Sequence, residues 1–317
     1  MTASAPVVTA HELPTYDELP VVPGLGLPHA WDLLDHDRGS LSLIDDERRL
    51  SAASQVQRGE SIGLNLPLDE LDPPLFGRAR IRHTVIDVGR NTHEDVLDGF
   101  NPQAGSQWDG LRHVRAREHG YFGGLADLRD PAPLGIQHWA ATGIVGRGVL
   151  LDVSRWAAEG GRPLDAFAGT EVTASDLDAC AAAQGVRVEP GDVVCLRFGW
   201  TTAYRALEPA ARAGSALGAA FSGLRADDAT AQWVWDHRIG ALCADNPALE
   251  CAPGDPAIGS LHRRLIPLLG TAVAELLDLD RLAHRCAELG RWTFLFVAVP
   301  LPLTGGVSSP SNALALL

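Results

Sequence analysis

The sequence predicts a mixed α/β fold, and two observations support that prediction. The first is a set of short apolar runs with the length and composition of buried strands, at residues 148–153, 192–198, 239–244 and 293–299. The second is helical periodicity between those runs. Thr173, for example, can cap a helix that extends to Gln184, because a threonine side chain accepts a bond from the first helical turn. Periodicity alone allows a doubly wound sheet or a barrel.

The remaining elements follow in chain order. The proline-rich first 30 residues lack steady periodicity, which predicts an extended arm over residues 1–35 or, alternatively, a disordered tail. The α/β domain is then expected to span residues 36–317.

Within that domain, residues 45–59 have the pattern of a helix. Residues 64–68 and 81–88 alternate in the manner of strands. An apolar stripe over residues 279–289 predicts a further helix, which Gly290 can end.

Composition and charge exclude several classes of function. With 317 residues, 46% of them hydrophobic, the chain can bury a large core. Its 40 acidic residues outnumber 26 basic ones for a net charge of −14, which argues against nucleic acid and anionic membranes as partners. Five cysteines without a Cys-x-x-Cys pair favour reduced thiols. No secretory signal and no membrane-length apolar run is evident, so a cytoplasmic protein is expected.

One segment, residues 103–113, concentrates polar side chains that could form a site. If it is extended, side chains alternate between its two faces, so Gln103, Gln107, Asp109 and His113 all point to one side. Trp108 then points the other way, into the core or a subunit interface. The segment therefore predicts a pocket lined by amides, a carboxylate and an imidazole.

The spacing of this segment resembles the signature of the cyclase superfamily, which includes kynurenine formamidase and isatin hydrolase. That signature reads His-x-Gly-Thr-His-x-Asp-x-Pro-x-His. Asp109 and His113 match it, as does Gly105, and Ser106 replaces the threonine. Gln103 and Gln107 stand where the family has metal-binding histidines, so this chain resembles a divergent member.

Similar stretches extend the resemblance from about Pro14 to the C-terminus, at residues 143–152, 189–200, 244–250 and 300–310. His262 and Glu275 stand where the family places a second histidine and a glutamate of the metal site, with a turn expected near Gly270 between them. The resemblance implies the swivelling β/β/α kynurenine-formamidase-like fold, as a single domain with an N-terminal arm.

The resemblance also implies a hydrolase that attacks an amide, lactam or lactone of a small molecule with water, with His113 as the proton shuttle. Asp109 would bind a metal or orient His113. Together with Gln103, Gln107, His262 and Glu275, it would form an oxygen-rich site that suits Mn²⁺ or Mg²⁺ better than Zn²⁺. Loss of two imidazole ligands leaves open that no metal is bound.

Two other functions remain open at this point. The first is a metal-independent cyclase or dehydratase, a lyase in which His113 moves protons together with Glu275 or His262. The second is an inactive small-molecule binding protein. In each case Gln103 and Gln107 could contact the substrate, and Tyr121 could shape the pocket mouth or simply pack a loop. The resemblance further implies a homodimer or homotetramer.

Overall fold

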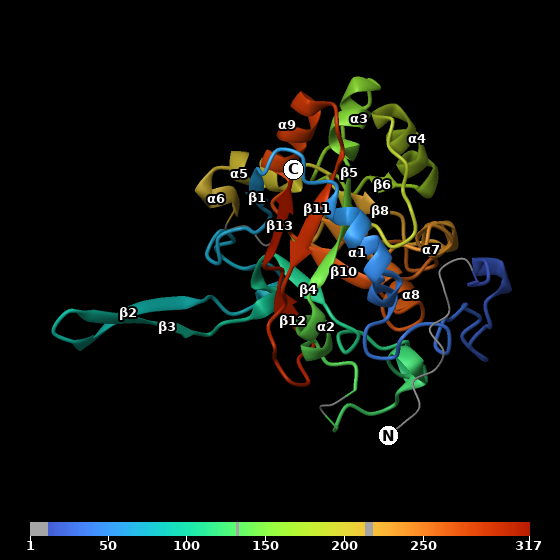
Figure 1. Cartoon of the computed structure of the whole chain (residues 1–317), viewed down its shortest axis with the longest axis horizontal. Coiled ribbons are helices and arrows are strands. Elements are labelled where there is room, and N and C mark those ends of the chain that lie inside the picture. The colour runs from blue at the N-terminus through green and yellow to red at the C-terminus, as the bar shows by residue number, and fades with distance from the viewer. Residues whose placement is uncertain (1–11, 131–132, 213–217) are drawn as a thin grey trace.

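The described residues, 12–130, 133–212 and 218–317 of this computed structural model, form a mixed α/β fold around one curled sheet (Figure 1). In order across this nine-stranded sheet, the strands are β1 (Ser61–Gly63), β13 (Ala313–Leu316), β11 (Thr293–Ala298), β5 (Ile144–Leu151), β7 (Val193–Leu196), β9 (Ala241–Ala244), β10 (Ala272–Glu275), β4 (Gln107–Asp109) and β12 (Ser308–Pro310). Strands β5, β7, β9 and β10 are parallel, and the flanking strands join antiparallel. The predicted α/β class is confirmed.

Helices surround this sheet, and α3, α4 and α7 lie side by side on it (Figure 1). The helices in the described ranges are α1 (Asp46–Ala53), α2 (Gln137–Thr142), α3 (Val153–Glu159), α4 (Ala174–Gln184), α5 (Trp200–Ala206), α6 (Pro209–Arg212), α7 (Asp228–Asp236), α8 (Leu261–Leu265) and α9 (Asp280–Leu289). A small parallel pair joins β6 (Glu171–Val172) to β8 (Gly223–Leu224). No helix in the described residues is long and apolar enough to cross a membrane.

The capping signals in the sequence predicted helix α4 closely. The side chain of Thr173 accepts a hydrogen bond from the backbone N–H of Asp176, and Asp176 accepts one from the backbone N–H of Thr173. Gly185 then ends the helix in the left-handed conformation, which glycine adopts without steric cost. The helix predicted over residues 279–289 is confirmed in the same way by α9 and Gly290.

Two predicted elements have different bounds from those observed. The helix predicted over residues 45–59 stops at Ala53, because the chain then turns to join the sheet, where Arg58 donates its backbone N–H to Leu317. The strand predicted at residues 64–68 is wrong. Strand β1 precedes it, and Pro67 has no N–H with which to continue a ladder.

The alternating pattern at residues 81–88 does form a strand, but not a half-buried one. Among the strands in the described ranges, β2 (Arg82–Gly89) and β3 (Thr92–Asp98) pair only with each other, and they project from the body as a long hairpin (Figure 1). Every residue of both strands is exposed. The hairpin starts a few residues after Arg78 and ends a few residues before Gln103, so it leaves and rejoins the body beside the polar segment.

The N-terminal segment, where it is described, packs against the body. Tyr16 and Leu19 are buried in the main core, and the indole of Trp235 donates a hydrogen bond to the carbonyl of Pro14. Residues 1–11 of the predicted arm lie outside the described residues. All five cysteines are free, as their pattern predicted, and all five are also buried.

Candidate functional site

The short strand β4 carries two of the polar side chains into the site. It pairs with β10, so Gln107 lies opposite Glu275 and Asp109 lies opposite Val273. Residues two apart on a strand share a face, which places Gln107, Asp109 and Glu275 on one side of the sheet. Trp108 points to the other side, where it is fully buried against Trp139 and Phe296, as alternation predicted.

Residues 103–113 are not extended throughout, the condition from which the shared polar face was predicted, although the polar side chains do come together. Only β4 is extended, because a 3-10 turn (Pro102–Ala104) precedes it and a turn closed by the backbone N–H of His113 follows. Gln103 nevertheless reaches both partners. Its amide nitrogen donates to Oδ1 of Asp109 at 2.8 Å and lies 3.3 Å from Nδ1 of His113.

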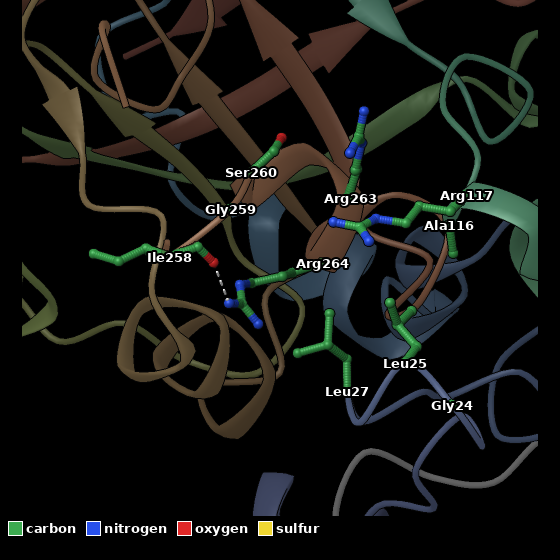
Figure 2. A pocket seen from close by; sticks show the side chains of 10 residues that line it. All are labelled: Gly24, Leu25, Leu27, Ala116, Arg117, Ile258, Gly259, Ser260, Arg263 and Arg264. Carbon is green, nitrogen blue, oxygen red and sulfur yellow. Dashed lines mark hydrogen bonds between the residues drawn. The ribbon is translucent and has the colours of Figure 1, made fainter. Parts of the chain in front are cut away.

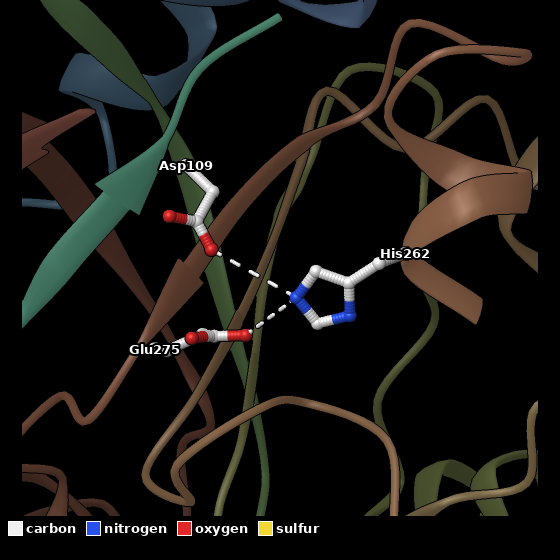
Figure 3. Close-up of side chains that lie close together, drawn as sticks. All are labelled: Asp109, His262 and Glu275. Carbon is white, nitrogen blue, oxygen red and sulfur yellow. Dashed lines mark hydrogen bonds and ion pairs between the residues drawn. The ribbon is translucent and has the colours of Figure 1, made fainter. Parts of the chain in front are cut away.

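A second segment brings a histidine and a glutamate to the same place. His262 lies on α8 and Glu275 ends β10, with the predicted turn at Gly270 between them. Nε2 of His262 lies 2.9 Å from Oε1 of Glu275 and 3.8 Å from Oδ2 of Asp109 (Figure 3). Nε2 of His113 faces the same oxygen of Asp109, also at 3.8 Å.

Both glutamine side chains present nitrogen, not oxygen, to the carboxylates. The amide of Gln107 donates to Oε2 of Glu275 at 2.7 Å, as that of Gln103 does to Asp109. A buried carboxylate gains stability from such donors, since they favour its charged form. Each glutamine therefore holds one carboxylate in place.

Arg78 is a site residue that the sequence did not reveal. Its guanidinium donates to the backbone carbonyl of Gln103 and lies 3.5 Å from the side-chain oxygen of Gln107. It also lies close enough to Glu275 and Asp109 for their charges to affect its pKa, which burial lowers. No motif signals it, because Arg78 lies outside the segment that resembles the signature.

Glu250 is the second residue of this kind. Its carboxylate lies 3.2 Å from Nδ1 of His262 and accepts a hydrogen bond from the hydroxyl of Ser260. The imidazole is thus held between Glu250 on one side and Glu275 and Asp109 on the other. The only sequence signal was that Glu250 follows a stretch similar to one in the family, which assigned it no role.

Burial and mutual charge set the protonation of this cluster. Burial raises the pKa of Glu275 to about 7, and the nearby charge of Asp109 adds to the shift. Burial would lower the pKa of His262, but Asp109, Glu250 and Glu275 together hold it well above its ordinary value. Burial lowers the pKa of His113, which keeps that imidazole neutral and able to accept a proton near pH 7.

The side chains also fit a divalent cation. Asp109, His262 and Glu275 each offer one ligand atom, and these atoms lie within 4.8 Å of one another. Oδ2 of Asp109 is buried and has no hydrogen-bond partner among the described residues. Burying a carboxylate oxygen without a partner costs free energy unless a cation or a proton binds to it. These three residues therefore form a candidate metal centre.

Backbone strain flanks this centre. Leu249, just before Glu250, and Leu276, just after Glu275, both have positive φ, at 56° and 54°. Such conformations disfavour residues with a Cβ atom and are frequent next to functional side chains. Tyr121, the predicted mouth residue, packs its ring 5.5 Å from the guanidinium of Arg115, and it has no hydrogen bond or ring contact with the cluster among the described residues.

Comparisons with known proteins identify a family and related folds. A family model described as "Putative cyclase" matches residues 62–251. A solved structure described as a novel cyclase is 29% identical, with a TM-score of 0.80, over 91% of this chain and 99% of that one. No curated protein matches the chain.

Isatin hydrolases share the fold at lower identity. One, bound to the product analogue thioisatinate, is 16% identical with a TM-score of 0.58, over 86% of this chain and 99% of that one. Isatin hydrolase A from Labrenzia aggregata, bound to benzyl benzoate, is 18% identical with a TM-score of 0.55, over 86% of this chain and 98% of that one.

Proposed function

The chain belongs to the putative cyclase family and is a cyclase- or hydrolase-type small-molecule enzyme, and from that premise we propose that it hydrolyses an amide, lactam or lactone. The observation that carries this proposal is the unsatisfied oxygen of Asp109, which faces both His113 and His262. A neutral imidazole beside a buried carboxylate can act as the general base for water attack on a carbonyl.

In the proposed reaction, water adds to the carbonyl carbon while its proton passes to the unprotonated ring nitrogen of His113. The resulting imidazolium is stabilised by Asp109, whose carboxylate oxygen lies 3.8 Å from Nε2 of His113. When the carbon–nitrogen or carbon–oxygen bond then breaks, His113 returns the proton to the leaving group. A divalent cation held by Asp109, His262 and Glu275 would supply a Lewis acid for the carbonyl.

Gln103 and Gln107 act as positioning residues in this proposal. Because both amides donate to carboxylates, their oxygens are not directed at the three candidate ligand atoms. We therefore assign the metal to Asp109, His262 and Glu275, and assign Gln103 and Gln107 to holding Asp109 and Glu275 in place.

A second candidate function, metal-independent proton transfer, has one observation in its favour. The pair of His262 and Glu275 is already a direct contact at 2.9 Å, and Arg78 adds positive charge beside it. A protonated His262 could therefore balance the carboxylates without an ion and serve as the acid of a cyclase or dehydratase. Mn²⁺ binding and metal removal separate the two candidates.

We expect metal-free protein to bind Mn²⁺, and the change Asp109→Asn to weaken that binding roughly 100-fold or more, since it removes a charged ligand. The measurement is the electron paramagnetic resonance signal of free Mn²⁺ during titration, which needs no substrate. Asp46→Asn, at a fully exposed carboxylate on α1, is the matched control and should leave the affinity unchanged.

The reaction itself is tested by measuring the turnover of a panel of formamides, lactams and lactones before and after a chelator removes bound metal. The hydrolytic proposal expects turnover to fall on chelation and to return with Mn²⁺. Full activity in metal-free protein, or Mn²⁺ affinity that is the same in Asp109→Asn, would contradict the metal-dependent mechanism and favour the second candidate.

We also propose that the enzyme is a homo-oligomer assembled through the hairpin of β2 and β3. An isolated two-stranded hairpin is marginally stable in water, yet this one exposes Val85, Val88 and Leu97 along its length. It carries both signs of charge, for example in the pairs His83–Asp95 and Arg82–Asp98. Exposed apolar side chains together with charges of both signs are features that a two-fold contact with a second copy would use.

The change Val85→Lys together with Leu97→Lys should therefore convert the oligomer to a monomer, because it introduces like charges that face each other across the contact. Sedimentation velocity measures the outcome. Leu50→Lys, at a side chain that is also exposed but lies on α1, is the control and should leave the mass unchanged. A monomeric unmodified protein would refute this assembly.

A further inference from the structure

A pocket of about 240 Å³ opens beside α8, apart from the Asp109 cluster (Figure 2). Three segments form its walls: the N-terminal stretch at Gly24–Leu27, the 3-10 turn at Arg117–His119, and the chain from Ile258 into α8. The lining does not include His113 or His262. The pocket is therefore a separate cavity, even though two of its walls continue directly from segments that carry site residues.

Three arginines give this pocket a positive charge. Arg264 is buried and fully engaged, since it bonds to Asp228 and to the carbonyls of Ala226 and Ile258. Arg117 and Arg263 are exposed, and within the described chain neither has a hydrogen bond or an ion pair. Two guanidinium groups without an acidic partner stand out in a chain with a net charge of −14.

The backbone holds Arg117 in an unfavourable conformation. Its φ is 51°, in the left-handed region that side chains with a Cβ atom rarely adopt. The turn is fixed by bonds between Ala116 and Gly120 and between His119 and Ala116. As a result the side chain of Arg117 reaches toward α8, the helix that carries Arg263 and Arg264 (Figure 2). Strain of this kind is more frequent where a side chain has a binding role.

The other walls are apolar. Leu25 and Leu27 pack on a small core formed by Val22, Ala116 and Leu268, and Ile258 adds a further aliphatic surface. A cavity that combines such surfaces with two free guanidinium groups is matched to a molecule with an apolar body and one anionic end. An inorganic anion would use the arginines but leave the apolar walls without a partner.

We propose that this pocket binds a small organic carboxylate, with Arg117 and Arg263 contacting the carboxylate and Leu25, Leu27 and Ile258 contacting the carbon chain. This site is independent of the proposed hydrolytic reaction. It adjoins the catalytic cluster through Ser260, which lines the pocket while its hydroxyl bonds to Glu250, the residue behind His262.

Hexanoate is a suitable probe, and hexanamide is its uncharged counterpart. Isothermal titration of the full chain should show hexanoate binding that is at least about tenfold tighter than hexanamide binding, because a charged hydrogen bond is lost with the carboxylate. Arg117→Gln and Arg263→Gln should each weaken hexanoate binding by about tenfold or more. Arg281→Gln, which removes the same charge from an exposed position on α9, should leave it unchanged.

His113→Ala distinguishes this pocket from the catalytic cluster, and it should leave hexanoate binding unchanged whatever it does to turnover. The proposal is overturned if hexanoate does not bind at about 10 mM, which corresponds to less than about 3 kcal/mol. It is also overturned if the arginine variants bind as the unmodified protein does, if hexanamide binds equally well, or if inorganic phosphate binds more tightly than hexanoate.

Discussion

Replacing His113 by alanine is expected to lower kcat by about 10²–10⁴-fold, the usual contribution of a positioned acid–base group. The imidazole faces Asp109 and is neutral near pH 7, so it is the group best placed to take a proton from water. Steady-state kinetics on whichever amide, lactam or lactone is turned over measures the loss. His119→Ala, at a histidine that instead pairs with Glu118, is the matched control.

The pH profile gives this prediction a second readout. Because burial lowers the pKa of His113, the unmodified enzyme should keep its activity down to about the ordinary imidazole pKa of 6.5 and lose it at lower pH. That acidic limb should be absent from any residual activity of His113→Ala. A variant that turns over normally would remove the proton shuttle, and ligand binding without turnover in the unmodified protein would favour a binding protein.

The second large effect is on stability. In metal-free protein, the change His262→Leu should lower the free energy of unfolding by about 3–5 kcal/mol, since it leaves buried carboxylates without their positive partner. His262 contacts Glu250 and Glu275 directly, and Oδ2 of Asp109 lies 3.8 Å from it. Urea unfolding at pH 6.5 in the presence of a chelator measures the difference.

The pH dependence of this effect has a defined sign. The pKa of His262 is raised in the folded protein, so its stabilising contribution is complete below about pH 6.5, the pKa of an unfolded histidine. The contribution is lost as the pH rises through the folded-state value, and the variant and the unmodified protein should then converge. His284→Leu, at an exposed histidine paired with Glu288, is the control and should have little effect. A loss of similar size in both variants would contradict this account.

Local signals in the sequence were reliable where the physics is local. The capping residues of α4 and the glycines after α4 and α9 marked the observed ends, because a cap is made within a few residues of the helix. The four apolar runs lie in strands β5, β7, β9 and β11. Strands β7 and β9 are buried on both faces, as a continuous apolar run predicts, whereas β11 buries every second residue.

Local sequence patterns failed to predict the burial or the length of an element where a residue distant in the chain determines it. The pattern at residues 81–88 alternates as a half-buried strand does, yet this strand is exposed on both faces and its hairpin packs on no core among the described residues. The helix predicted to Gly59 ends early because Arg58 pairs with the far end of the chain at Leu317. Periodicity describes one element and contains no information about what it will pack against.

The sequence by itself predicted the α/β class, that Trp108 points away from the polar face of its segment, and that Gln103, Gln107, Asp109 and His113 come together. Only the tertiary structure decided that Glu250, His262 and Glu275 surround Asp109, that Arg78 lies beside them, and that the amides of Gln103 and Gln107 point nitrogen at the carboxylates. One reason is that most of these contacts join residues far apart in the chain. The other is that an amide side chain can present either its nitrogen or its oxygen, and the charge of the neighbouring group decides which.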